Sequence, residues 1–554
     1  MKRLFFALVL YVVTVGMHAI PAKPGLWRVL TLKDGTEVRA QLTGDEFCHY
    51  WRTDDGRNFV KSGEAFIEVP EVTMSHRAQS RRAARRASAM TRRTAIGERT
   101  HFIGKKKGLV ILAEFKDVSF KTANDQEKYN KILNEEGYTT REGFEGSVAD
   151  YFKAQSGGQF EVEFDVFGPV QLANNQKYYG QNDEYDQDMR AEKMIVEACR
   201  AIDSQANFSD YDWNGDGEVD EVYVVYAGKG EASGGDENTI WPHMYYLEYV
   251  DINLFLDNVR INTYACSNEL DALNHIEGIG GICHEFSHCL GYPDFYDTAN
   301  GSAISLFGYD IMDQGPYNGD GFVPAGYSAY EKWMAGWIEL TVLSNQNVTV
   351  NNLKPVSEGG GGYIIYNDGH LDEYYILENR QQTNWDKYLP GRGLMITHVD
   401  FDSDLWYLNV PNSILTSQHE YVTQYGYPTN DHMRFNIFRA DNSAKSSYTS
   451  LSRDLYPYQK NDSLTATSKP AATFYNKTKQ GETIMQGGIL DITQNRDGTM
   501  NFVYRAPIED TGISELLPDS DHTPSVVYDL QGRRFFGNLP KGIYIVNSKK
   551  IVVK

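Results

Sequence analysis

The stretch of the chain best suited to chemistry is GIGGICHEFSHCLGYPDFYD, residues 278–297. On a helix, His284 and His288 lie about one turn apart and face the same way, so both imidazoles can reach one metal ion. Glu285 is displaced by about a third of a turn, a position suited to a water molecule on that ion rather than to the ion itself. The spacing therefore predicts a metal site that activates water.

The residues after this helix supply a third ligand. Gly291 can adopt the left-handed conformation that ends a helix, and the chain can then turn back and present the carboxylate of Asp294. Three protein ligands leave the fourth position of a zinc ion for water, as in catalytic zinc sites. We expect one zinc ion on His284, His288 and Asp294, with Glu285 as general base. The alternative is a buried helix whose histidines make only structural hydrogen bonds.

The pattern HExxHxxGxxD, followed by a Tyr-Asp pair, resembles the immune inhibitor A family of secreted zinc metallopeptidases, in the metzincin clan. Other blocks between roughly residues 25 and 505 are similar to the same family. They are residues 147–152 with 155–158, YDWNGDGEVDEVYVVYAGKGEA at 211–232, IWPH at 240–243, and ENRQQTNWDKYLPGRGLMITHVD at 378–400.

The resemblance implies a zinc endopeptidase with the ligands and base named above. It also implies a methionine turn beneath the metal, for which Met312 in residues 308–313 is the candidate. In some metzincins a tyrosine follows this methionine by two residues and helps to hold the oxyanion. Gln314 occupies that position here, with Tyr309 and Tyr317 nearby, so the sequence leaves the oxyanion group open.

A second metal is predicted in the loop Asp212–Asp220, where oxygen-bearing side chains alternate and Gly217 is sixth. This matches the first half of an EF-hand-like calcium loop. Asp212, Asn214 and Asp216 are the expected first ligands, with Asp220 closing a shortened loop, because Tyr223 stands where the usual bidentate Glu would be. The alternative is an Asx-rich turn between elements.

Other histidines are expected to be structural, since a single histidine is more often so than a ligand. They are His101, His243, His275 and His398.

The N-terminus predicts an export signal over residues 1–19. Lys2 and Arg3 precede an apolar run from Leu4 to Gly16, and Ala19 is the small residue before the expected cut. The alternative, a membrane anchor, is disfavoured because the run falls short of the roughly 20 apolar residues that span a bilayer. We therefore expect a secreted or cell-surface protein.

Residues 20–107 are expected to form a propeptide. Segments between 20 and 76 alternate apolar and polar residues around Asp-Gly turns, as in a small β-meander. An Arg-rich linker, 77–107, follows and is suited to processing. Residues 1–107 carry a net charge of +10 within a chain of −22, which leaves −32 for the rest. This acidic balance argues against a nucleic-acid partner.

The cysteines suggest one or two disulfides. Cys266 with Cys283 is the first choice and Cys199 with Cys289 the second, because residues 283 and 289 point to different sides of one helix. Buried free thiols are the alternative. Cys48, in the front segment, is read as a packing residue, although its thiol could cap the zinc.

The remaining chain divides into a catalytic domain at 108–338, a β-rich domain at 339–508 and a β segment at 509–554. The last resembles the C-terminal sorting domains of Bacteroidetes type IX secretion, which implies secretion machinery or the cell surface as a partner. The expected fold class is α+β: a twisted sheet with an active-site helix, followed by sandwich-like β structure.

The sequence thus predicts a zinc endopeptidase of protein or peptide substrates, made as a zymogen. Two alternatives stay open: a surface adhesin with a vestigial peptidase domain, and a zinc hydrolase of a non-peptide bond.

Overall fold

The computed structural model describes most of the chain. The described residues are 18–46, 48–63, 65–70, 102–183, 187–299, 305–418, 422–423, 428–443, 450–507, 527–529, 534–535, 542–546 and 549–553. They divide into two units, residues 1–93 with 100–507 and residues 94–99 with 508–554. Most of the predicted leader, the Arg-rich part of the linker and His101 lie outside the described residues. No helix in the described ranges is long and apolar enough to cross a membrane.

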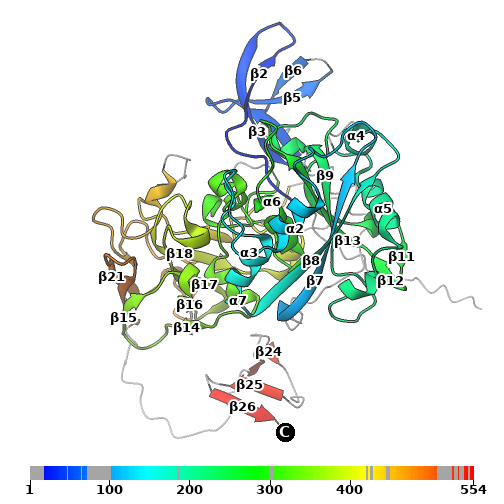
Figure 1. Cartoon of the computed structure of the whole chain (residues 1–554). Coiled ribbons are helices and arrows are strands. Elements are labelled where there is room, and N and C mark those ends of the chain that lie inside the picture. Colours follow the sequence, from blue (N-terminus) through cyan, green and yellow to red (C-terminus); the bar gives the residue numbers. More distant parts are fainter. Residues whose placement is uncertain are drawn as a thin grey trace, which may run out of the picture. The chain divides into compact units, whose positions relative to one another are not determined.

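A six-stranded sheet forms the centre of the predicted catalytic region (Figure 1), in the order β1-β10-β13-β9-β7-β8. The strands are β1 (His18–Ala19), β7 (Gly104–Glu114), β8 (Phe160–Gln171), β9 (Val222–Lys229), β10 (His243–Tyr246) and β13 (Thr263–Leu270). The pairs β7–β8, β7–β9 and β9–β13 are parallel, whereas β10 and β1 are antiparallel to their neighbours. Residues 109–113 of β7 and 222–227 of β9 are continuous apolar, buried runs, as expected where helices cover both faces of a sheet.

Helices pack on the two faces and create two cores. The helices are α2 (Gln126–Asn134), α3 (Val148–Gln155), α5 (Ala191–Ile202) and α6 (Gly280–Cys289). One core contains α2, α3 and α6, and the other contains α5. Alternation along β9 divides its side chains, since Tyr223 and Val225 join the α6 core while Val224 and Tyr226 join the α5 core.

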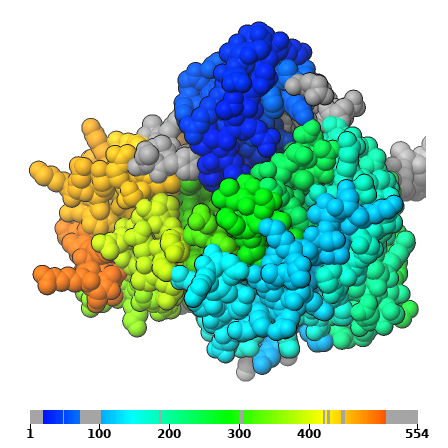
Figure 2. Space-filling model, turned by 45° about the horizontal axis from the view of Figure 1, so that its top comes forward, coloured from blue at the N-terminus to red at the C-terminus, as the bar shows by residue number. Residues whose placement is uncertain are grey.

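The front of the chain forms a separate five-stranded antiparallel sheet in sequential order, as the predicted meander requires. Its strands are β2 (Trp27–Thr31), β3 (Glu37–Asp45), β4 (Cys48–Arg52), β5 (Asn58–Ser62) and β6 (Ala65–Val69). In Figure 2 this blue part lies against the green middle of the chain. In the segment that leads into this sheet, Lys23 N donates to Ala232 O at 2.9 Å.

The β-rich region downstream contains two sheets around a third core. The first consists of β14 (Leu340–Val342), β16 (Gly362–Asn367), β17 (His370–Arg380), β18 (Gly393–Asp400) and β19 (Phe435–Ile437). The second consists of β15 (Val348–Leu353), β20 (Leu464–Thr465), β21 (Gly488–Gln494) and β22 (Met500–Arg505). The whole is a mixed α+β fold, as predicted.

A buried ionic network ties the β-rich region to the catalytic region. Arg380, fully buried on β17, donates to both carboxylate oxygens of Asp386, at 2.8 and 3.0 Å, and to the carbonyl of Gly326 at 3.1 Å. Glu378 accepts the N–H of Ala329, at the start of helix α7 (Ala329–Met334), at 2.7 Å. The charges are paired as burial requires, so the two regions share one interior.

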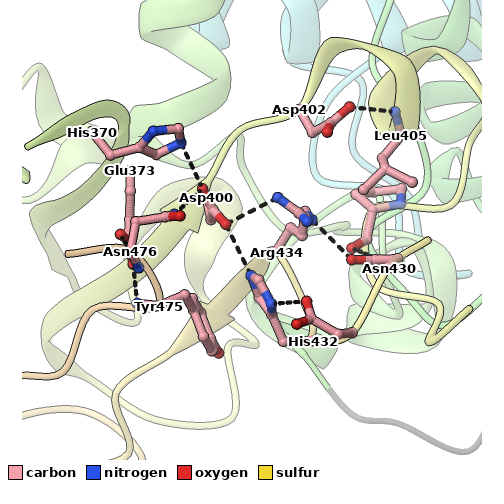
Figure 3. Close-up of polar contacts among 12 residues, drawn as sticks. His370, Glu373, Asp400, Asp402, Leu405, Asn430, His432, Arg434, Tyr475 and Asn476 are labelled. Atoms are coloured by element: carbon pink, nitrogen blue, oxygen red, sulfur yellow. Dashed lines mark hydrogen bonds and ion pairs between the residues drawn. The ribbon is translucent and has the colours of Figure 1, made fainter. Parts of the chain in front are cut away.

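A polar cluster at the end of β18 connects further loops of this region (Figure 3). Asp400 is buried and lies 2.9 Å from Arg434 Nη1 and 3.0 Å from His432 Nε2. Asn476 Nδ2 donates to it at 3.2 Å. Because Asp400 already has several donors, we interpret the cluster as structural.

The C-terminal unit contains one four-stranded antiparallel sheet in the order β24-β23-β25-β26. Its strands are β23 (Val527–Asp529), β24 (Arg534–Phe535), β25 (Gly542–Val546) and β26 (Lys549–Val553).

Candidate active site

The predicted metal-binding helix is observed as α6, and close backbone contacts fix where it begins. A Cβ on Gly280 would lie 1.9 Å from the carbonyl oxygen of Pro316, and one on Gly278 would lie 2.1 Å from the backbone of Gly321. Only glycine fits this approach. After the helix, Gly291 has a φ of 89°, the left-handed turn that the sequence predicts, and the chain returns toward α6.

Three ligand atoms meet beside α6. Nε2 of His284 and Nε2 of His288 are 3.3 Å apart, and Oδ1 of Asp294 lies 3.2 Å from the first and 3.5 Å from the second. The Nδ1 atoms face the carbonyls of Ile311, at 2.7 Å, and Tyr292, at 2.8 Å. Each Nδ1 therefore carries the proton, and both Nε2 lone pairs point to the shared centre.

This triangle fits a tetrahedral zinc ion. Ligand atoms bonded to one zinc at about 2.0–2.2 Å lie about 3.3–3.6 Å from one another. Asp294 is fully buried, and its Oδ1 has no hydrogen-bond partner within the described part of the chain. A buried carboxylate oxygen without a donor is costly, and a cation would satisfy it.

The electrostatics agree with a cation site. Burial alone would raise the pKa of Asp294, yet the imidazoles of His288 and His284 hold it well below its usual range. Burial lowers the pKa of His288. Asp294 is therefore an anion whose preferred neighbour is positively charged.

Glu285 lies next to the triangle without joining it. Its Oε2 is 4.0 Å from His288 Nε2, and burial raises its pKa to about 8. Its Oε1 accepts the backbone N–H of Ile20 at 2.7 Å. The side chain thus points at a peptide bond from the front of the chain.

That front segment lies in the cleft as an extra strand. His18 and Ala19 pair antiparallel with Met244 and His243 of the edge strand β10. The next two carbonyls are held by side chains: Trp241 Nε1 donates to Ile20 O at 2.8 Å, and Tyr317 OH donates to Pro21 O at 2.5 Å. An extended peptide is therefore bound by backbone pairing directly over Glu285.

A tyrosine outside the expected set contacts the same peptide bond. The hydroxyl of Tyr296 lies 2.5 Å from the carbonyl oxygen of Ala19. Glu285 and Tyr296 thus hold the two ends of the Ala19–Ile20 peptide bond. Sequence reasoning missed Tyr296, although it is the first residue of the Tyr-Asp pair after the predicted ligand Asp294.

The other oxyanion candidates lie in different surroundings. Tyr309 OH donates to Leu451 O at 2.7 Å, and Gln314 N–H donates to Phe307 O. Met312 is buried in the loop that supports the site, since its carbonyl accepts the N–H of Phe295 at 2.7 Å. Only Tyr317 of the three candidates contacts the cleft segment.

The remaining predicted histidines lie apart from the triangle. His243 is buried with Nδ1 2.7 Å from Trp241 O. His275 is exposed and 3.6 Å from Asp271, and His398 is 2.7 Å from Glu373. Each has a local partner, as a structural role requires.

The predicted calcium loop is closed by its own side chains. Asp212 accepts the N–H groups of Gly215 and Gly217, and Asp220 accepts that of Trp213 at 2.6 Å. Among the described residues, the carboxylates of this loop do not gather within 4.8 Å of one another. Burial, with Asp216 and Asp212 nearby, raises the pKa of Asp220 to about 7. The loop has the form of the Asx-rich alternative, and calcium stays a prediction.

A second group of acidic side chains lies where the front sheet meets the catalytic region. Glu46, Asp188 and Glu231 are buried, with ligand atoms within 4.8 Å of one another. Glu46 accepts the N–H of Asp188 at 2.9 Å, and His49 lies 3.5 Å from Glu231.

The predicted disulfides are wrong for the described thiols, because Cys199, Cys266, Cys283 and Cys289 are free. Cys266 points into the α5 core and Cys283 into the α6 core, so the sheet separates them. Cys199 lies in the α5 core, whereas Cys289 packs against the other. The alternative of free thiols holds. The side chain of Cys48 lies outside the described residues, so the possibility that its thiol caps the zinc stays untested.

Two histidines and a glutamate on the buried helix α6, with the carboxylate of Asp294 from the turn that follows, have the arrangement expected for the site of a metal-dependent hydrolase. Comparison with known proteins indicates which kind of metal-dependent hydrolase this part of the chain resembles. Residues 102–342 match the family described as immune inhibitor A peptidase M6, catalytic domain.

Two relatives each match part of the chain. The pre-pro-metalloprotease PrtV of Vibrio cholerae is 27% identical over 253 residues, which cover 40% of this chain and 27% of PrtV. Immune inhibitor A of Bacillus thuringiensis subsp. alesti is 24% identical over 272 residues, which cover 42% of this chain and 39% of the relative. The chain thus spans well under half the length of these relatives. The matches support a metallopeptidase domain in this part of the chain.

Proposed function

We propose that the protein is a secreted, zinc-dependent endopeptidase made as a zymogen. The observation that carries the proposal is the meeting of Glu285 and the buried triangle of His284, His288 and Asp294 at a peptide bond, that between Ala19 and Ile20. The export cut predicted after Ala19 would break this bond and leave Ile20 N beside Glu285 Oε1. A vestigial domain in an adhesin would have no reason to keep all four groups aligned on such a bond.

Bound zinc would lower the pKa of a water molecule and polarise the substrate carbonyl. Glu285 is placed to accept a proton from the attacking water and to return it to the leaving nitrogen, whose position Ile20 N marks at 2.7 Å. The Tyr296 hydroxyl would donate to the carbonyl oxygen as negative charge develops there. The edge strand β10 and Tyr317 would align the substrate backbone.

Latency would follow from occupation of the cleft by the front of the chain. The segment 20–23 would stay on the chain after the predicted export cut. Ile20 contacts Glu285 and Pro21 contacts Tyr317, so a substrate must displace this segment. Lys23 Nζ also lies 3.1 Å from Glu277 Oε1, and both side chains are largely buried. Cleavage within residues 77–107 would let the front sheet leave.

Residues 509–554 would attach the enzyme to the secretion machinery or the cell surface.

The decisive experiment measures zinc content and casein hydrolysis for wild type and Glu285→Ala after removal of the front segment. We expect both to bind one zinc, and the variant to lose about 10²–10⁴-fold in turnover, the range for general acid–base catalysis. Equal turnover would overturn the mechanism. Zinc binding with no peptide hydrolysis by wild type would favour the non-peptide hydrolase. If wild type showed no peptide hydrolysis and bound no zinc, the adhesin would be favoured.

A further inference from the structure

Asn409 lies in the β-rich region, beyond the residues that match the peptidase family, yet it reaches the candidate zinc site. It follows helix α8 (Ser403–Tyr407) and is fully buried. Its φ is 56°, in the left-handed region where asparagine is better tolerated than most residues. Its backbone is fixed on both sides, because its N–H donates to Trp406 O at 3.1 Å and its carbonyl accepts from Thr298 Oγ1 at 2.7 Å.

Both ends of the Asn409 carboxamide bind one residue, Asp294. Nδ2 donates to Asp294 Oδ2 at 2.7 Å, across a sequence separation of 115 residues. Oδ1 accepts the backbone N–H of Asp294 at 2.6 Å. The amide therefore fixes the backbone and the carboxylate of Asp294 together.

This contact decides which oxygen of Asp294 faces the histidines. With Oδ2 engaged by the amide, Oδ1 is the atom that lies 3.2 Å from His284 and 3.5 Å from His288. Without the amide, the carboxylate would be free to turn about its side-chain bond. A ligand held in one orientation loses less entropy on binding a metal, and loss of such a supporting contact typically costs about 10–100-fold in metal affinity.

We propose that Asn409 is a positioning residue that holds Asp294 in the orientation that binds zinc. The inference rests on the proposed zinc peptidase function. It makes the β-rich region a part of the active site rather than an appended domain.

The test compares Asn409→Asp with Asn412→Asp in the full chain. Aspartate at 409 keeps the size and the acceptor for Asp294 N–H, but it replaces the Nδ2 donor by an oxygen facing Asp294 Oδ2. Asn412 is a matched control because it is also fully buried in the same loop. Its Nδ2 donates to the carbonyls of Phe295 and Phe435, at 2.7 and 2.8 Å, and not to Asp294.

The readouts are zinc affinity by chelator competition, the absorption spectrum of the cobalt-substituted protein and the unfolding midpoint of the metal-free protein. We expect Asn409→Asp to lose about 10–100-fold in zinc affinity, with an altered cobalt spectrum. In the activated enzyme we expect kcat to fall and KM to change little. Asn412→Asp should lose comparable stability while it keeps the wild-type affinity and spectrum.

A protonated aspartate at position 409 could still donate to Asp294 Oδ2, whereas glycine cannot. Wild-type affinity and spectrum in both Asn409→Asp and Asn409→Gly would therefore overturn the inference, as would equal losses of affinity in Asn409→Asp and Asn412→Asp. If Asn409→Asp does not fold, Asn409→Gly applies the same test, because glycine accepts the left-handed backbone and removes both contacts. Failure of wild type to bind zinc would instead refute the proposed function, so the two failures are distinguishable.

Discussion

At the scale of single residues, the group proposed to hold the oxyanion differs from the candidates that the sequence motif suggests. The sequence directs attention to Gln314, Tyr309 and Tyr317, near the methionine turn. In the structure Tyr296 binds the carbonyl of the peptide over Glu285. Its position two residues after Asp294 lets one short loop supply both the proposed metal ligand and a hydrogen-bond donor.

Tyr296→Phe tests this role. The change removes the hydroxyl and keeps the ring, so we expect zinc content and folding to be unchanged in the activated enzyme. Loss of an oxyanion donor should lower kcat about 10²–10³-fold. Steady-state kinetics on a peptide substrate measure the effect, with Tyr309→Phe as the control because its hydroxyl contacts Leu451. Equal kcat values for Tyr296→Phe and wild type would assign the oxyanion to another group.

The α6 residues could be predicted because four-residue spacing on a helix is a local property. Asn409 could not, since nothing near it in the sequence marks it and its partner lies 115 residues away. The disulfide pairs failed for a related reason. The face that Cys266 occupies depends on the register of β13 within the sheet, and the spacing of cysteines carries no information about it.

At the scale of elements, the Asp212–Asp220 loop joins a 3₁₀ turn to β9, the central strand next to β7. Its carboxylates bind backbone N–H groups, and the partial burial of Asp220 raises its pKa to about 7. An unfolded aspartate titrates near pH 3.9. Between these values the folded state binds more protons, so the stability contributed by Asp220 falls as pH rises through this window.

Calcium should offset this loss of stability at the pH values where Asp220 is charged. We expect millimolar calcium to raise the melting temperature by a few degrees at pH 8, through binding to the folded state alone, and by less at pH 5. Asp212→Ala should abolish the shift. Asp497→Ala, in a surface turn, should retain it. A melting temperature indifferent to calcium and chelator at both pH values would leave the loop as an ordinary Asx-rich turn.

At the scale of the whole molecule, the front sheet was predictable as an element but not as an occupant of the cleft. Alternating residues and Asp-Gly turns mark its strands. The contact of Ile20 with Glu285 spans 265 residues, and only the folded chain reveals it. The basic excess of residues 1–107 agrees with docking on the acidic remainder of the chain, although salt screens such attraction beyond about 10 Å.

Lys23→Ala should loosen the front segment and raise the residual activity of the unprocessed protein. Lys23 and Glu277 are only 15% and 12% exposed, and a charged hydrogen bond of this kind is worth about tenfold in an equilibrium. Lys61→Ala is the control, since Lys61 pairs with Glu237 across the same boundary but in solvent, where about twofold or less is expected. Casein hydrolysis before processing measures both, and equal activity in both variants would contradict the role of Lys23.

The ionic network around Arg380 has a consequence for how this enzyme could be shortened. The family match ends at residue 342, but a polypeptide cut there would lose the guanidinium that binds Gly326 and the carboxylate that caps Ala329. It would also lose Asn409. We expect such a fragment to lack the proposed peptidase activity even if it is soluble. Transfer of residues 102–342 alone to another protein should therefore not transfer the activity. By the same reasoning, one backbone cleavage between residues 342 and 409, followed by dissociation of the C-terminal fragment, should abolish the proposed activity irreversibly.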